Sequence, residues 1–121
     1  MPIDRAEQDP AVRALTELVS VLDSCMAELG GARVRAEKLL EERQSGRSWL
    51  DIVTTESRPL VVEHISSVMA ALASAGGAWR REQAHALASE QVSINRIAAM
   101  FGVTRQRISA LLRERARTAQ A

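Results

Sequence analysis

The side chains best suited to chemistry in this sequence lie at positions 105–113, where arginine, glutamine and serine recur at spacings that share one side of a helix. The apolar residues of this stretch, Ile108, Leu111 and Leu112, would form its buried side. The residues left on the exposed side are Arg105, Gln106, Ser109, Ala110 and Arg113. Guanidinium and carboxamide groups can form paired hydrogen bonds to a planar partner. This is the chemistry of recognition rather than of bond making.

Residue sets that support catalysis or metal binding do not occur elsewhere in the sequence. It has no glycine-rich phosphate loop and no Ser, His and Asp set at a usable spacing. His64 and His85 have no second ligand at metal-binding spacing, and paired carboxylates such as Glu41-Glu42 lie on a charged helix face. The single cysteine, Cys25, excludes an internal disulfide and fits a reducing compartment. We therefore expect neither an enzyme nor a bound metal or cofactor.

Two short helices joined by a tight turn would position residues 105–113. The first helix has four apolar residues on one face, namely Ile94, Ile97, Ala98 and Phe101. Gly102 tolerates a positive φ and so ends this helix, and Val103 is an apolar plug in the turn. Thr104 offers a hydroxyl in the position that caps the second helix. A plain helical hairpin is the alternative that this pattern leaves open.

The stretch 93–113 resembles the helix-turn-helix of bacterial repressors, activators and site-specific recombinases. It has a small residue, Ala98, where the two helices cross, and a glycine, Gly102, in the turn. Its apolar wedge between the helices consists of Ile97, Val103, Ile108 and Leu111. The resemblance covers about twenty residues and shows no departure at these structural positions. It implies an all-α fold in which the helix starting at Thr104 enters the major groove of double-stranded DNA.

The resemblance also implies two kinds of DNA contact. The expected base contacts are Arg105, Gln106, Ser109 and Ala110. Arginine pairs with guanine and glutamine with adenine, each worth roughly 1–3 kcal/mol of discrimination, and a phosphate contact is the alternative for each of these residues. The expected phosphate contacts are Ser93, Asn95, Arg96, Thr104, Arg107, Arg113, Arg115 and Arg117. Arg80 and Arg81 are further candidates for nonspecific attraction.

Charge is distributed unevenly along the chain, although its formal net value is only +1. Up to Ser57, eleven acidic residues stand against seven basic ones, a balance of −4. From Arg58 onward, nine arginines stand against four glutamates, a balance of +5. A basic chain end is expected where a protein meets a polyanion, and a solvated basic tail is the alternative.

The remainder of the chain is predicted to be helical as well. We expect a flexible arm (1–9), a helical dimerisation region (10–56), a core helix (57–75), the helix-turn-helix unit (78–117) and a tail (118–121). Asp9 and Pro10 would begin the first helix, which carries an apolar stripe. The stripe consists of Val12, Leu15, Leu18 or Val19, Leu22, Cys25 or Met26, and Leu29. This spacing of three and four predicts dimerisation, as in a coiled coil, or else an intramolecular bundle.

Glycine-rich positions predict interruptions of the helices. We favour a break or kink at Gly30-Gly31 over one long helix weakened by about 1 kcal/mol per glycine. The segment 74–77 (SAGG) is the clearest linker in the sequence.

Three further helices are expected between these interruptions and the turn. Ser48 and Asp51 have the spacing of a capping box for a short helix that ends at Val53. Its buried residues would be Trp49, Leu50 and either Ile52 or Val53. Ser57 and Pro59 would start the core helix, with an inner face of Leu60, Val61, Ile65, Val68, Met69 and Leu72. A supporting helix at 79–91 would turn inward Trp79, Gln83 or Ala84, Leu87 and Ala88.

We therefore predict a sequence-specific DNA-binding protein, a transcriptional regulator that acts as a homodimer with recognition helices about 34 Å apart. The alternatives are a module that binds transcription machinery, such as a sigma factor, and an architectural or recombination-associated DNA binder. No apolar run reaches the roughly twenty residues that span a bilayer, so we expect a cytoplasmic, nucleoid-associated protein that binds no membrane. Lys38 is the only lysine beside fifteen arginines, a bias that resembles chains from GC-rich bacteria such as actinobacteria.

Overall fold

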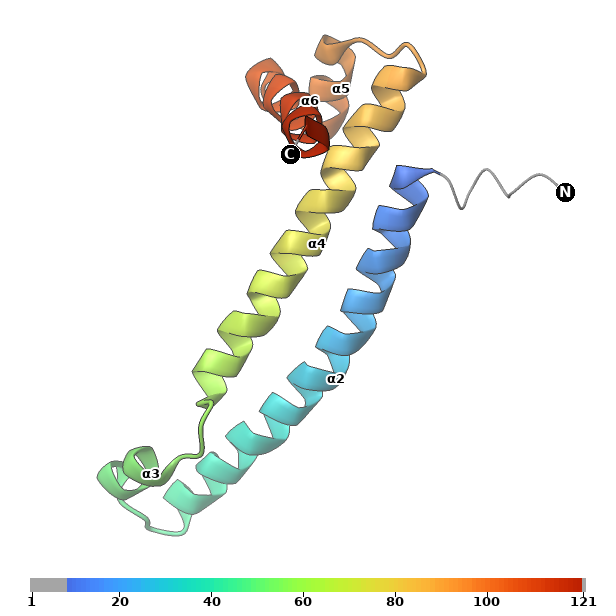
Figure 1. Cartoon of the computed structure of the whole chain (residues 1–121). Helices are drawn as coiled ribbons and strands as arrows, with labels where there is room; N and C mark the ends of the chain where they lie inside the picture. The colour runs from blue at the N-terminus through green and yellow to red at the C-terminus, as the bar shows by residue number, and fades with distance from the viewer. Residues whose placement is uncertain (1–8, 121) are drawn as a thin grey trace, which may run out of the picture. The chain divides into compact units, whose positions relative to one another are not determined.

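The computed structural model describes residues 9–120, with side chains described for residues 9–114. Every regular element in this range is an α-helix, which confirms the predicted all-α class. The helices are α2 (Pro10–Gln44), α3 (Trp49–Thr55), α4 (Val61–Ser89), α5 (Ile94–Phe101) and α6 (Arg105–Gln120) (Figure 1). The expected arm falls on residues outside this range except for Asp9, and α6 includes residues 118–120 of the expected tail.

The chain divides into two compact units, each described here by itself. Unit 1 comprises Met1–Leu18 and Ala75–Ala121, and unit 2 comprises Val19–Ser74. Helices α2 and α4 each contribute residues to both units. The division falls within these two continuous helices rather than at a loop.

Unit 2 is built on a pair of helices with a small core. Cys25 and Ala32 of α2 and Val68 of α4 are buried, and the Cys25 thiol donates to the Val68 carbonyl oxygen with a sulfur to oxygen distance of 3.9 Å. Helix α3 adds Ile52, which is also buried. The core of this unit is therefore a narrow strip between α2 and α4, closed at one end by α3.

The glycine pairs do not interrupt the helices. Helix α2 runs unbroken through Gly30 and Gly31, so no break occurs there, and α4 runs through Gly76 and Gly77, so the predicted linker is wrong. Each glycine weakens a helix by about 1 kcal/mol, a cost that tertiary packing can offset. Buried Ala32 lies directly after the first pair and supplies such packing.

Polar side chains at the helix starts explain several boundaries. The Asp9 carboxylate accepts from the Ala11 N–H at 2.8 Å, and the Ser48 hydroxyl accepts from the Asp51 N–H at 3.1 Å, which confirms both predicted caps. Helix α4, in contrast, begins at Val61 and not at Pro59. The Glu56 carboxylate accepts from the Val61 N–H at 2.8 Å, so a carboxylate preceding the helix takes the capping role expected of Ser57.

Several apolar residues predicted to be buried in unit 2 are exposed. Of the predicted core of α3, only Ile52 is buried, while the exposed residues are Trp49, Leu50 and Val53. A helix of seven residues turns only one narrow face toward its neighbours, so the other apolar side chains point outward. On α4, Ile65 and Met69 of the predicted inner face are exposed as well, whereas Val68 is buried.

Helix α4 is long and apolar enough to meet one criterion for a membrane span. An 18-residue window within Val61–Ser89 has a mean hydropathy of 1.2, so by length and composition alone this helix could cross a membrane. The core helix of a soluble protein can meet the same criterion. Of that window, 11 % is buried in the structure.

Unit 1 has the better-defined core. Its buried residues are Ala84, Ile97, Ala98, Ile108 and Leu111. Around them pack the partly buried residues Leu87, Ala88, Val92, Ile94, Phe101 and Leu112. The end of α4, all of α5 and the start of α6 thus share one apolar cluster, which fixes α6 against the other two helices.

Candidate nucleic-acid interface

The turn between α5 and α6 is defined by hydrogen bonds at both of its ends. Gly102 has φ 68°, its N–H donates to the Ala99 carbonyl oxygen at 3.3 Å, and the Val103 N–H donates to the Ala98 carbonyl oxygen at 3.0 Å. These two bonds end α5 with a left-handed glycine, as in a Schellman motif. The Thr104 hydroxyl then accepts from the Arg107 N–H at 3.1 Å, which confirms the predicted cap of α6. Both ends of the turn are therefore fixed by hydrogen bonds between residues close in sequence.

Buried side chains set which way α6 faces. Ile108 and Leu111 are buried and lie in one cluster with Ile97 and Ala98 of α5. Val103 was predicted to fill the space between the two helices, but it is 41 % exposed. The space between the two helices is already filled by Ile97 and Ile108, which are fully buried. Because residues 3.6 positions apart complete a turn, the side chains between these anchors face outward.

The outward side of α6 gathers most of the residues predicted to contact bases. A surface hollow of about 390 Å³ is lined by Arg105, Gln106, Ser109 and Arg113. Ser109 is half-buried, and the other three side chains are exposed. Ala110 is half-buried beside this group and does not line the hollow. Two guanidinium groups, a carboxamide and a hydroxyl therefore share one concave surface, on which they can form several hydrogen bonds to a single partner.

The residues predicted to contact phosphate lie around the same turn. Ser93, Asn95 and Arg96 are exposed at the start of α5, where the Ser93 side chain accepts from the Arg96 N–H at 3.2 Å. Thr104 and Arg107 are exposed at the start of α6. Arg115 and Arg117 belong to α6, but their side chains lie outside the described residues.

The charge of this surface is uniformly positive. No aspartate or glutamate occurs between Glu90 and Glu114, a stretch that holds four arginines. These are Arg96, Arg105, Arg107 and Arg113, all of them exposed. A group of exposed arginines creates the positive potential that attracts polyanions.

Two arginines of α4 contact α5 and α6 within unit 1. The Arg80 guanidinium carbon lies 4.2 Å from the centroid of the Phe101 ring, a cation–π contact. The Arg81 guanidinium lies 3.4 Å from the Glu114 carboxylate of α6. The sequence pattern gave no sign of either contact, since α4 is separated from α5 and α6 by a loop and shares no period with them. Both contacts tie α4 to the two helices of the candidate interface.

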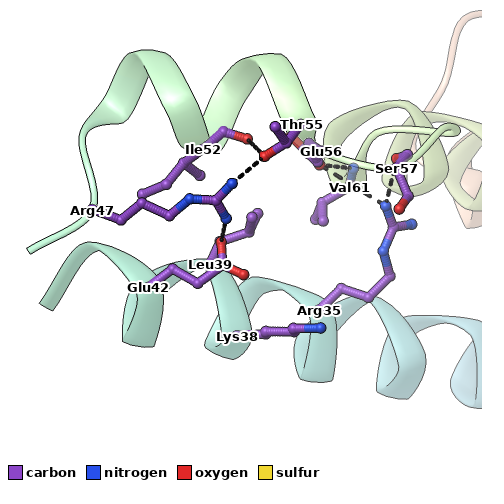
Figure 2. Close-up of a pocket in the computed structure, with 10 residues that line it drawn as sticks. All are labelled: Arg35, Lys38, Leu39, Glu42, Arg47, Ile52, Thr55, Glu56, Ser57 and Val61. Atoms are coloured by element: carbon purple, nitrogen blue, oxygen red, sulfur yellow. Dashed lines mark hydrogen bonds and ion pairs between the residues drawn. The ribbon is translucent and has the colours of Figure 1, made fainter. Parts of the chain in front are cut away.

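A second hollow, of about 280 Å³, lies in unit 2, and the two arginines that line it already have partners (Figure 2). Arg47 donates to Glu42 at 3.0 Å, to Thr55 at 2.7 Å and to Asp51, and the hydrogen bond to Asp51 raises the pKa of the Arg47 guanidinium above its ordinary value. Because three protein groups from α2 and α3 occupy this guanidinium, we assign it to holding α3 in place.

Arg35 has a similar role in the same hollow, as Figure 2 shows. Its guanidinium donates to the Ser57 carbonyl oxygen at 2.9 Å and to the Pro59 carbonyl oxygen at 2.8 Å. It also lies 3.9 Å from the Glu56 carboxylate. Arg35 therefore fixes the segment that leads from α3 into α4, and this hollow is a structural feature of unit 2.

Among the described residues, no group of three or more His, Cys, Asp or Glu side chains could hold a metal ion. The hollow on α6 brings together four polar side chains, of which three were predicted to contact bases. A comparison of the chain with protein-family models, with curated proteins and with solved structures finds no match.

Proposed function

We propose that this chain is a sequence-specific double-stranded DNA-binding protein and acts as a transcriptional regulator. In this proposal α5, the turn and α6 work as a helix-turn-helix, with α6 entering the major groove. The observation that carries the proposal is the shared hollow of Arg105, Gln106, Ser109 and Arg113 on the outward side of α6. Three of these side chains lie in the first turns of the helix, which is the part that reaches base edges in such complexes.

Base reading follows from the chemistry of the hollow. The Arg105 guanidinium presents two parallel donors that match the O6 and N7 acceptors of guanine. The Gln106 carboxamide presents one donor and one acceptor, which match N7 and N6 of adenine. Ser109 can donate to or accept from several bases, and the small side chain of Ala110 allows close approach to a thymine methyl group.

Affinity would come from the phosphates flanking the groove. Arg96, Arg107 and Arg113 are exposed, and no aspartate or glutamate lies between Arg96 and Arg113. The start of α5 adds Ser93 and Asn95 at a helix N-terminus, where backbone N–H groups favour a phosphate. Binding of this kind releases counterions, so the logarithm of the binding constant falls with the logarithm of the salt concentration, by about 0.9 per phosphate neutralised.

The test starts by selecting bound duplexes from a random pool and then measures binding by fluorescence anisotropy. Gln106→Ala should lose about 1–3 kcal/mol on the selected duplex, roughly 5- to 150-fold in affinity, and change little on a scrambled duplex. Gln44→Ala is the matched control, because Gln44 is an exposed glutamine at the end of α2 in unit 2. It should bind both duplexes as the unmodified protein does.

Two results would reject the proposal in different ways. Equal losses on the selected and scrambled duplexes would remove Gln106 from base reading. Absence of any salt-dependent binding to duplex DNA would reject DNA as the partner and would favour a module that docks on another protein through the same arginines.

A further inference from the structure

Unit 2 leaves two rows of apolar side chains exposed. On α2 the row consists of Val19, Leu22, Met26 and Leu29. On α4 the row consists of Val62, Ile65 and Met69. These residues are between 38 and 71 % exposed. Single exposed apolar residues are ordinary on a protein surface, but rows on two paired helices are typical of an interaction surface.

Both rows follow the spacing of three and four residues that packed helices use at positions a and d of a heptad. Met26 on α2 and Met69 on α4 each take an a position. The residue directly before an a position is g, and the two g residues here, Cys25 and Val68, are buried in contact with each other. Each helix therefore has the apolar a, d and g pattern of a bundle helix, of which the chain itself covers only the g side.

The two rows lie on the same side of the helix pair. Cys25 contacts Val68, while Arg35, further along α2, reaches Ser57 and Pro59 before the start of α4, so the two helices run antiparallel. On each helix the residue at position a follows the buried g residue by one position, which is a rotation of about 100° around the helix axis. Equal rotations on antiparallel neighbours turn both rows toward the same side. Unit 2 thus presents one broad apolar face.

We propose that a second copy of this chain covers that face, so that two helix pairs form a four-helix bundle. A second copy presents the same two rows, which can interdigitate about a two-fold axis. Such a partner buries the side chains at the a and d positions of all four helices at once. The helix pair alone leaves the side chains of both rows at least 38 % exposed.

The charges beside the rows favour a protein partner over a lipid surface. Helices that lie in a membrane interface are rich in lysine and arginine on their polar side. Between positions 19 and 32 the charged residues are Asp23 and Glu28, and the first charged residue of α4 is Glu63. The row on α2 ends at Arg33, which takes the next a position and pairs with Glu37 at 3.4 Å.

The test compares lysine substitutions at two exposed apolar residues of α2, one on the row and one off it. Met26 is 71 % exposed within the row, and Val34 is 66 % exposed but lies off the row. Sedimentation equilibrium of the full chain without DNA should give about 26 kDa, twice the 13.2 kDa of one chain. Met26→Lys should give the monomer mass, whereas Val34→Lys should keep the dimer mass. Far-UV circular dichroism checks that both variants stay helical.

Several outcomes would overturn the proposal. A wild-type protein that sediments as a helical monomer at about 100 µM, a concentration at which micromolar affinity gives mostly dimer, would do so. Equal behaviour of the two variants would also exclude this face as the interface. If Met26→Lys fails to fold, Met69→Lys on α4 is the second variant, and a dimer mass for a folded Met69→Lys protein counts against the proposal. Flotation of a monomeric wild type with phosphatidylcholine vesicles would identify a membrane as the occupant instead.

This inference does not depend on the proposed function, because the mass is measured without DNA. A dimer that fails to bind DNA would refute only the proposed function, and a monomer that binds DNA would refute only the dimer. If both proposals hold, each particle carries two copies of α6, and the selected duplexes should contain two half-sites in inverted orientation.

Discussion

Substitution of glycine by alanine should have opposite effects at different positions of this chain. Gly31 in α2 and Gly77 in α4 lie inside continuous helices, and a Cβ built on either meets no atom within 4 Å. Gly102 has equally open space for a Cβ, but its φ is 68°. Because crowding is absent at all three positions, backbone conformation alone decides the sign of each effect.

The expected magnitudes follow from helix propensity and from the cost of a left-handed residue. Gly31→Ala and Gly77→Ala should each stabilise the chain by about 1 kcal/mol, and together by about 2 kcal/mol because the sites share no contacts. Gly102→Ala should destabilise it by roughly 1–2 kcal/mol. For a chain of 121 residues, 1 kcal/mol corresponds to a change in melting temperature of about 3–6 °C.

Urea denaturation followed by circular dichroism at one fixed protein concentration measures these changes. Amide hydrogen exchange adds a local readout, since opening of α2 near Gly31 should slow in Gly31→Ala while opening of unit 1 stays the same. The continuity of α2 would be refuted if Gly31→Ala lowered stability or sped up exchange around the substituted site. If Gly77→Ala lowered stability or sped up exchange around Gly77, the continuity of α4 would be refuted in the same way.

Two further predictions concern the core of unit 1 and the start of α4. Ile108→Ala should cost about 2–5 kcal/mol in urea denaturation because Ile108 is fully buried, whereas Val103→Ala should cost less than about 1 kcal/mol; similar costs would contradict the assigned burial. The Leu60 N–H donates to the Glu63 carboxylate at 2.8 Å, and this bond, helped by Arg58, lowers the pKa of Glu63 below its ordinary value of 4.5. The stabilisation is therefore present above pH 4.5 and lost as pH falls through the folded-state pKa, and an NMR titration midpoint of Glu63 at or above 4.5 would refute the contact.

The features that sequence could predict were those decided within a few residues. The caps at Asp9, Ser48 and Thr104 each depend on one side chain and an N–H two or three positions later, so the local sequence specifies them completely. The end of α5 at Gly102 is local in the same sense. Helical class and the residues around this turn could therefore be predicted without knowledge of the rest of the chain.

The features that could not be predicted from the sequence depend on which helix faces pack against each other. Cys25 and Met26 stood as alternatives for one apolar stripe, but they differ by about 100° around the helix and belong to two different faces. Only the packing of α2 on α4 shows that Cys25 is inward and Met26 outward. The predictions made at the two glycine pairs failed for the same reason, because contacts distant in sequence outweigh the low helix propensity of glycine. The stacking of Arg80 on Phe101 likewise has no local signature.

Cys25, the one cysteine of this chain, lies where its labelling can report the separation of a single pair of helices. Cys25 is almost fully buried, with its sulfur turned to the Val68 carbonyl of the opposite helix. A thiol-specific dye can reach it only when α2 and α4 separate in unit 2. The rate of labelling therefore measures the opening of that helix pair, free of any signal from α5 and α6, and it does so without an engineered probe.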